Sequence, residues 1–349
     1  MQDALQIEVA SAGPSAMTRP ESRALVFGAV LVVCIFASAT FASWLPLQIS
    51  IVTVFLFAGP HNWFELRYFL MRLPVRFGKS RNFFLTAFTG LGILTISYVA
   101  LPVVYRATSW TNEGWSIVIA SWNTLLLVWL CVLILLRGEQ KPRSNWTWAV
   151  PVTLAACGLN WLAPDFFSLA LVYIHPLIAF WFLDRHLRRT RPSWVATYRR
   201  CLAIVPVVVL LMIWQLTQTS SLAETNGLFW RITQHSGAEL LPNVSSHLLV
   251  SIHLFLEMLH YGVWIIALPL IGSTVKRKSK PIWDPKSIPI ARHPRGFPKS
   301  MALLLCLGLV VVVVLWAGFS VDYATTRDIY FTLAIAHVMA EAPFLLRMI

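Results

Sequence analysis

The chain has 349 residues, of which 57% are hydrophobic and only 12% are charged, and its mean hydropathy is +0.68. In soluble globular proteins about a quarter of the residues are charged, so this composition excludes a soluble domain and a disordered chain. Lys and Arg outnumber Asp and Glu by 28 to 15. In so apolar a chain, the resulting charge of +13 indicates contact with anionic lipid and excludes a nucleic-acid partner.

The apolar runs predict an all-α, polytopic membrane bundle of about ten transmembrane helices. A hydrocarbon core of about 30 Å needs about 20 apolar residues per helix. Residues 1–23 are predicted to be a polar cytoplasmic tail, and residues 24–349 a single transmembrane domain. In chain order, the predicted spans are 24–43, 45–66, 83–105, 114–136, 147–163, 164–184, 201–218, 246–271, 300–320 and 328–347.

Positive charge orients these spans. With ten spans, every Lys and Arg falls on one side of the membrane except Arg106, Arg231 and Arg327. Because cytoplasmic loops carry an excess of Lys and Arg, both termini are predicted to be cytoplasmic. The longest loops are an outer one near 219–245 and a basic inner one near 273–299. We expect an integral protein of a bacterial inner membrane.

Ionisable residues occur inside several predicted spans. His253, Glu257 and His260 are separated by four and then three residues, a spacing that places all three on one helix face. Glu257 and His260 also form a Glu-x-x-His pair of the kind found in di-iron carboxylate bundles. A purely structural role is the alternative for this triplet.

Three further spans carry the same residue types. His61 and Glu65 are four residues apart, as are His337 and Glu341, and His175 stands next to a proline. These residues lie in spans two, six and ten, which run in the same direction as span eight and hold them at similar depths. Alternatively, His175 is a packing residue, and Glu65 pairs with a nearby Arg67 or Arg72.

Four parallel helices are therefore predicted to converge on one buried polar centre. Burying carboxylates and imidazoles in hydrocarbon is costly without compensation, and a divalent metal compensates economically. We predict one or two ions, with carboxylates as ligands or as groups that orient the imidazoles. The predicted metal ligands are His61, His175, His253, His260 and His337, and the accompanying acids are Glu65, Glu257 and Glu341.

Four short stretches resemble, in order, motifs of the bacterial carotene-cleaving dioxygenase family called Brp/Blh. In that family the first motif has one residue between its glycine and its proline, and the third motif has two histidines four residues apart. In this chain the residue four after His253 is Glu257, and the second histidine, His260, is seven after it. The stretches are Gly59-Pro60-His61-Asn62, Ile174-His175 with Asp184, His253 and His260 in HLFLEMLHYGVW, and His337 and Glu341 in AHVMAEAPFLLR.

The resemblance implies a membrane-embedded non-haem iron oxygenase. It implies Fe(II) held by His61, His175, His337 and either His253 or His260, where O₂ would be activated. A carotenoid or another apolar polyene or lipid would enter from the bilayer and be cleaved to aldehydes. Two alternatives remain open: a proton- or metal-coupled transporter that uses the same His/Glu cluster, and a structural membrane protein with a stabilising ion. Stoichiometric iron in the purified protein favours the enzyme.

Overall fold

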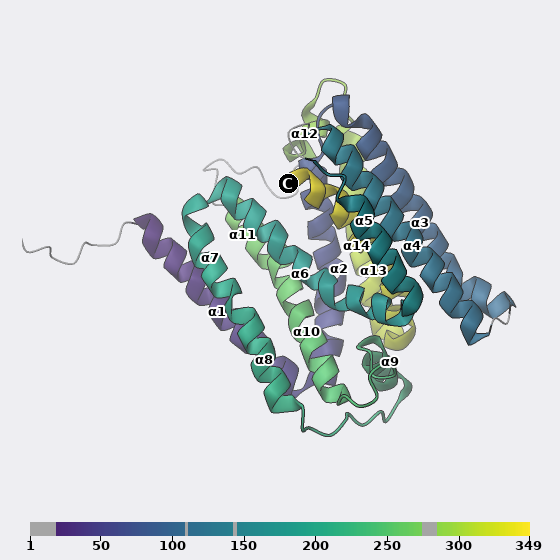
Figure 1. The fold of residues 1–349 in the computed structure, drawn as a ribbon. Helices are drawn as coiled ribbons and strands as arrows, with labels where there is room; N and C mark the ends of the chain where they lie inside the picture. Colours follow the sequence, from purple (N-terminus) through teal and green to yellow (C-terminus); the bar gives the residue numbers. More distant parts are fainter. Residues whose placement is uncertain (1–18, 109–110, 142–144, 274–284) are drawn as a thin grey trace, which may run out of the picture.

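The structure is a computed structural model that describes residues 19–108, 111–141, 145–273 and 285–349. All regular secondary structure in these ranges is helical. The α-helices, labelled as in Figure 1, are α1 (Arg19–Trp44), α2 (Pro46–Arg72), α3 (Arg81–Thr108), α4 (Asn112–Glu139), α5 (Ala149–Leu162), α6 (Pro164–Thr190), α7 (Val195–Leu202), α8 (Ile204–Leu216), α9 (Gly227–His235), α10 (Ser246–Gly262), α11 (Leu268–Ser273), α12 (Pro289–Arg292), α13 (Pro298–Val321) and α14 (Tyr323–Met348).

Eight helical segments of the described chain are long and apolar enough to cross a membrane, so the chain is a helical membrane protein. The helix α5 is apolar but has only 14 residues. The helix α2 has 27 residues and is not among the eight, because His61, Asn62 and Glu65 interrupt its apolar run. The eight segments are α1, α3, α4, α6, α7 with α8, α10 with α11, α13 and α14.

The helix α1 begins at Arg19, so the end of the predicted polar tail is helical. The rest of that tail, residues 1–18, lies outside the described residues, as do residues 274–284 of the predicted basic inner loop. The predicted outer loop near 219–245 contains the short helix α9. The hydroxyl of Tyr173 on α6 lies within hydrogen-bond distance of two carbonyls, that of Ser236 in this segment at 2.9 Å and that of Leu249 on α10 at 3.1 Å, and its one proton joins α6 to either.

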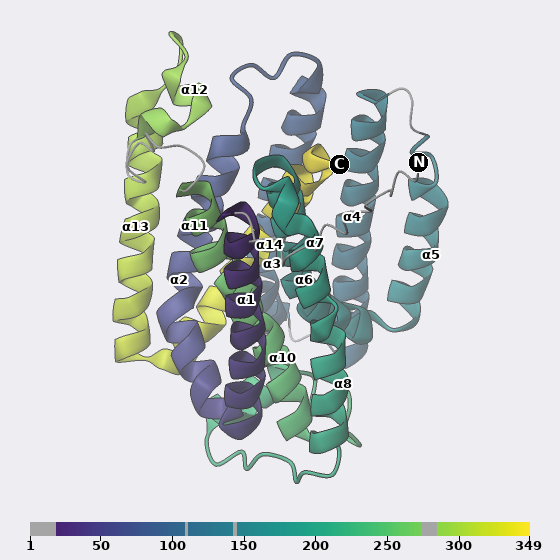
Figure 2. The same cartoon turned by 90° about the vertical axis from the view of Figure 1, so that its left-hand side faces the viewer.

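Four helices occupy the centre of the bundle. The helix α10 contacts α2 and α6, and α14 contacts the same two helices (Figure 1). Helices α1, α7 and α8 lie on one side of this group, and α3, α4 and α5 lie on the other. Figure 2 shows α13 at one edge of the molecule, where it packs against α2 and α14. The four central helices are the ones that carry the predicted site residues.

Aromatic packing joins the central helices on the C-terminal side of the predicted site residues. Phe69 of α2 stacks on Phe344 of α14 with ring centroids 4.3 Å apart. Trp264, which is fully buried, lies 5.7 Å from the Phe69 ring and 5.2 Å from that of Phe182 on α6. Rings of this size dominate the energetics of apolar cores. This cluster therefore fixes the relative positions of α2, α6 and α14.

Each central helix departs from regular α-helical hydrogen bonding near its site residue. Pro60 lies inside α2, Pro176 inside α6 and Pro343 inside α14. The helix α10 contains no proline but continues into a π-helical turn, Val263–Ala267. Because proline lacks an N–H, and a π turn changes the hydrogen-bonding step, both features locally redirect a helix.

Basic side chains secure the end of α14. Arg137 Nε on α4 donates to the carbonyl of Leu346 at 3.1 Å, and Arg189 on α6 donates to that of Met348 at 3.4 Å. Cations at a helix C-terminus also interact favourably with its dipole. These contacts hold the helix that carries His337 and Glu341 against two of its neighbours.

Candidate metal centre

One histidine from each central helix lies in a single cluster, the four-histidine centre: His61 of α2, His175 of α6, His260 of α10 and His337 of α14. The described residues contain two groups whose ligand atoms all lie within 4.8 Å of one another. His260 belongs to both groups. They are His61 with His260 and His337, and His175 with His260 and Glu341.

The two groups form one compact centre. Nε2 of His175 lies 3.3 Å from Nε2 of His337, which joins the second group to the first. The imidazole centroids of His175 and His260 are 4.7 Å apart, and those of His61 and His337 are 5.1 Å apart. Among the imidazole pairs of this centre that make ring contacts, His260 and His337 have the largest centroid separation, 6.5 Å.

Local backbone contacts orient the first histidine. Nδ1 of His61 lies 3.1 Å from the carbonyl of Phe57, one turn earlier on α2. A carbonyl only accepts, so Nδ1 must carry the proton, and Nε2 is left with a free lone pair. The ring of Tyr261, at a centroid distance of 4.4 Å, packs against this imidazole. His61 is therefore held as a ligand-competent tautomer.

Glu341 lies beside His175. Its Oε2 is 3.2 Å from Nδ1 of His175, although the two groups are not oriented for a hydrogen bond. Glu341 is fully buried and lies one turn beyond His337 on α14. A carboxylate at this position can bind an ion or orient the imidazole of His175.

Unpartnered buried atoms test whether the centre fits a metal. Leaving a buried polar group without a hydrogen bond costs about 1–3 kcal/mol, so native structures contain few of them. Several of those in this chain are concentrated here, and all are nitrogen or carboxylate oxygen atoms that can bind a divalent cation. They are Nε2 of His61, Nδ1 of His175, both ring nitrogens of His260, Nδ1 of His337 and both carboxylate oxygens of Glu341. The donor set therefore fits a metal ion.

Glu65 is a further buried acid near this centre. It lies one turn beyond His61 on α2, is 1% exposed and has no hydrogen-bond partner for either oxygen. It is close enough to Glu341 for the two carboxylates to interact electrostatically. It belongs to neither metal-binding group.

The structure places His253 and Glu257 apart from the centre. Because an α-helix rises about 1.5 Å per residue, the seven residues between His253 and His260 amount to about 10 Å, too far to share one ion. The ring of His253 instead lies 5.2 Å from that of His235. Glu257 accepts a hydrogen bond from the hydroxyl of Tyr261 at 2.7 Å. The predicted shared face exists, but only its His260 reaches the other histidines.

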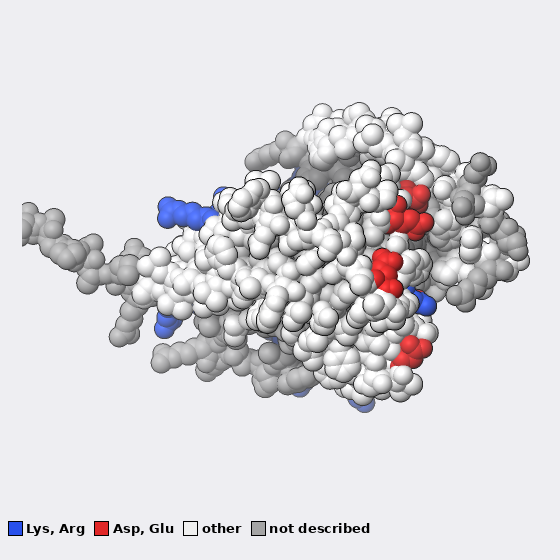
Figure 3. All heavy atoms as spheres, turned by 90° about the horizontal axis from the view of Figure 1, so that it is seen from below, with Lys and Arg blue, Asp and Glu red and all other residues white. Residues whose placement is uncertain are grey.

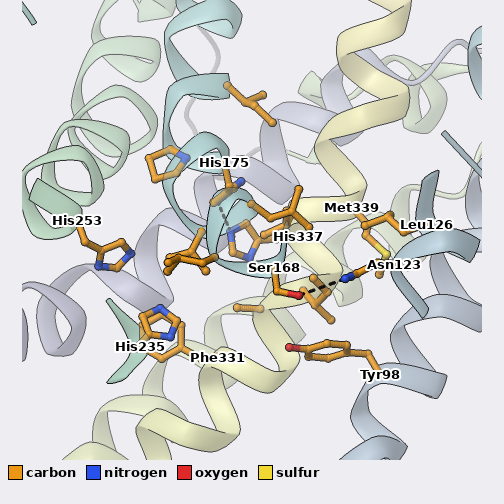
Figure 4. Close-up of a pocket in the computed structure, with 18 of the residues that line it drawn as sticks. Tyr98, Asn123, Leu126, Ser168, His175, His235, His253, Phe331, His337 and Met339 are labelled. Carbon is orange, nitrogen blue, oxygen red and sulfur yellow. Dashed lines mark hydrogen bonds between the residues drawn. The ribbon is translucent and has the colours of Figure 1, made fainter. Parts of the chain in front are cut away.

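A cavity of about 840 Å³ opens beside the four-histidine centre. Figure 4 shows His175 and His337 between two arms of it: His235 and His253 lie on one side, and Asn123, Ser168 and Tyr98 lie on the other. Drug-sized ligands occupy pockets of about 300–1,000 Å³, so this volume suits a sizeable molecule. Apolar and aromatic side chains provide much of the lining, among them Trp122, Leu126, Trp129, Leu171, Phe331 and Ile335.

Sequence reasoning did not identify His235 as a cavity residue. It lies on α9, outside the membrane-spanning segments, and no spacing relates it to His253 on α10. Only the fold of the segment between α8 and α10 brings the two rings together. The contact of Tyr261 with His61 was missed for a similar reason, because it crosses from α10 to α2.

Comparison of the chain with protein-family models, curated proteins and solved structures gives no significant match.

Proposed function

We propose that this protein is a membrane-embedded, iron-dependent oxygenase that cleaves a double bond of a carotenoid or another apolar polyene or lipid. One observation carries the proposal: four imidazoles from four helices, with unpartnered nitrogen atoms, meet beside a largely apolar cavity. The order of the motifs, which resembles that of the Brp/Blh family, gives independent support.

His61, His175, His260 and His337 are the proposed ligands. Imidazole suits iron, copper, zinc and nickel alike. Four imidazoles complete the coordination of a tetrahedral zinc ion, whereas Fe(II), which prefers more ligands, keeps positions open for reactants. Bound Fe(II) supplies the activation of O₂. Glu341 orients His175 or binds directly, and we keep Glu65 and Glu257 as proposed accessory acids of the cavity region.

The reaction needs no further oxidant or reductant. One O₂ and one C=C bond give two C=O groups, so each aldehyde product receives one oxygen atom. The aromatic lining from Trp122 and Trp129 would hold the polyene against the four-histidine centre and keep water away from it. Since the cavity is embedded in a membrane bundle, an apolar substrate reaches it from the lipid.

We further propose ten spans with both termini in the cytoplasm of a bacterial cell, α2 and α5 being the two spans added to the eight. The end of the bundle that carries α9 supports this orientation. Figure 3 views that end and shows a group of Asp and Glu side chains, with few Lys or Arg. Of the described basic residues there, Arg231 pairs with Asp328, and Arg327 is buried. This end would face outward under the positive-inside rule.

The test is metal analysis of the purified protein together with O₂-dependent turnover of β-carotene. We expect about one iron per chain and carbonyl products. His61→Ala and His260→Ala remove proposed ligands and are expected to abolish both. His247→Ala is the matched control, because this histidine lies on α10 but hydrogen-bonds the carbonyl of Ser43 at 2.8 Å.

Full iron occupancy in the two ligand variants would refute the assignment. Protein that contains no metal and supports pH-driven flux in proteoliposomes would instead establish the transporter.

A further inference from the structure

Two imidazoles in the cavity are not used by the four-histidine centre. His235 of α9 and His253 of α10 both line the cavity, and their rings lie 5.2 Å apart. In the part of the chain that the structure describes, neither ring hydrogen-bonds a protein group. Their nitrogen atoms are available to a ligand in the cavity.

In the opposite arm, the amide of Asn123 and the hydroxyl of Ser168 differ in this respect, whereas the hydroxyl of Tyr98 hydrogen-bonds no described residue. The amide nitrogen of Asn123 donates to Oδ1 of Asn160 at 2.9 Å and to Oγ of Ser168 at 3.2 Å. Both of its protons are thus engaged within the protein. Figure 4 shows that this pair and the two histidines lie on opposite sides of His175 and His337. A long ligand that crosses the centre would therefore have one end at His235 and His253.

The charges in the cavity indicate what that end can be. The charged side chains among its described lining residues are Asp165, Glu239 and Glu257, all of them acids. Arg327, a buried cation close to His235 and His253, does not line the cavity and interacts with Glu257, so the three carboxylates that do line it still disfavour a ligand with a carboxylate of its own. A neutral group with an oxygen atom avoids this repulsion.

Neutral imidazoles match such a group. Burial, and then the neighbouring Arg327 and His253, hold the pKa of His235 well below its ordinary value, so the ring is neutral at pH 7. A neutral imidazole offers one donor and one acceptor, which is the complement of a hydroxyl group. A pure hydrocarbon would leave these groups unpaired when it displaced water from them.

We infer that the substrate is a polyene with a neutral oxygen-bearing end group, a hydroxyl or keto group, that hydrogen-bonds His235 and His253. This inference rests on the proposed oxygenase function and narrows its substrate class. It also gives His235 and His253 a role in specificity: they fix which part of the polyene lies against the four-histidine centre.

The test is ligand binding to chelator-treated full-length protein in detergent, which separates binding from catalysis. The cavity tryptophans Trp115, Trp122 and Trp129 allow binding to be followed by fluorescence quenching. β-Carotene and β-cryptoxanthin differ by one hydroxyl, and retinol and retinoic acid differ by charge at the same end. Because one hydrogen bond changes affinity by about fivefold, we expect about that preference for β-cryptoxanthin, and retinol to bind more tightly than retinoic acid.

Variants assign the preference to its residues. His253→Leu and His235→Leu, singly and together, are expected to remove the preference for β-cryptoxanthin. Unchanged binding of β-carotene shows that each variant is folded, and His247→Leu, the matched control, is expected to keep the preference. Equal affinities in the unmodified protein, a preference that survives the double variant, or tighter binding of retinoic acid would each overturn the inference.

These outcomes are separable from those of the proposed function. Protein that prefers β-cryptoxanthin but oxidises neither carotenoid supports the subsite and refutes the oxygenase. Protein that oxidises β-carotene and shows no preference refutes the subsite alone.

Discussion

At the scale of single residues, the distinctive feature is a set of buried polar atoms with no protein partner. Both oxygens of Glu341 and both ring nitrogens of His260 are among them, although each residue lies on a well-packed helix. The hydroxyl of Tyr261, whose ring lies 5.9 Å from that of His260, donates to Glu257 instead. Buried atoms without partners also occur elsewhere in the described chain, but in the four-histidine centre they share one small space and are all potential metal ligands.

Glu341 offers the sharpest single-residue prediction. Glu341→Gln keeps the size of the side chain but removes the charge beside Nδ1 of His175. We expect the affinity for Fe(II) to fall about 10- to 100-fold, as it does when groups that support metal ligands are replaced. Titration of Fe(II) into chelator-treated protein measures this affinity.

Glu224→Gln is the control for that titration. Glu224 accepts a hydrogen bond from Thr233 at 2.5 Å in the segment between α8 and α10, away from the centre. An affinity for Fe(II) that is equal in Glu341→Gln and in the unmodified protein would exclude Glu341 from the site.

At the scale of elements, α3 and α4 form the wall of the cavity opposite His253. Trp129 of α4 lines the cavity and donates through Nε1 to the carbonyl of Thr86 on α3 at 3.1 Å. Gly90 makes this approach possible, because a Cβ at that position would overlap the indole of Trp129.

Gly90→Ala is therefore expected to push α3 and α4 apart. Overpacking of this kind costs about 1–3 kcal/mol of stability, so the melting temperature should fall. Gly92→Ala is the matched control on the same helix, since nothing lies within 4 Å of an added Cβ there. Thermal unfolding followed by near-ultraviolet circular dichroism distinguishes the two. Equal melting temperatures for both variants would contradict the packing argument.

The helices themselves were largely predictable, and the reason is physical. Long apolar runs must form helices to satisfy their backbone groups in lipid, so their positions can be read from composition. The predicted ends of the helices were less accurate. The span predicted over 164–184 is a helix that continues to Thr190, because a helix can extend beyond the apolar core of the membrane. The helix α9 and the π-helical turn gave no signal in the apolar pattern.

The site was predictable only in part. From the direction and depth of the spans, His61, His175 and His337 are predicted to lie close together, and in the structure each of them lies in a group that includes His260. Spacing along α10 was less informative, because residues four and three apart share a face without sharing a depth. His253 therefore looked equivalent to His260, although the two lie about two turns apart along the helix.

At the scale of the whole molecule, charge separates the two ends of the bundle. If the end that carries α9 faces outward, a cysteine placed there is accessible to a membrane-impermeant maleimide in intact cells. In a variant whose five native cysteines have been replaced, we expect Glu224→Cys to be labelled in intact cells, without permeabilisation. Lys299→Cys, at the start of α13 and at the other end, is expected to be labelled only after permeabilisation. Labelling of Lys299→Cys in intact cells would reverse the proposed orientation.

The prolines and the π-helical turn have a mechanical consequence. Pro60, Pro176 and Pro343 each leave a carbonyl on the preceding turn of the helix without its usual N–H donor. In α10, the π-helical turn that follows His260 changes the spacing of the backbone hydrogen bonds. The four backbones are therefore most easily bent at the level where the imidazoles meet. An ion bound there would cross-link four helices that each bend easily at this point. Backbone amides next to the four histidines would then exchange their hydrogens more slowly with the ion than without it.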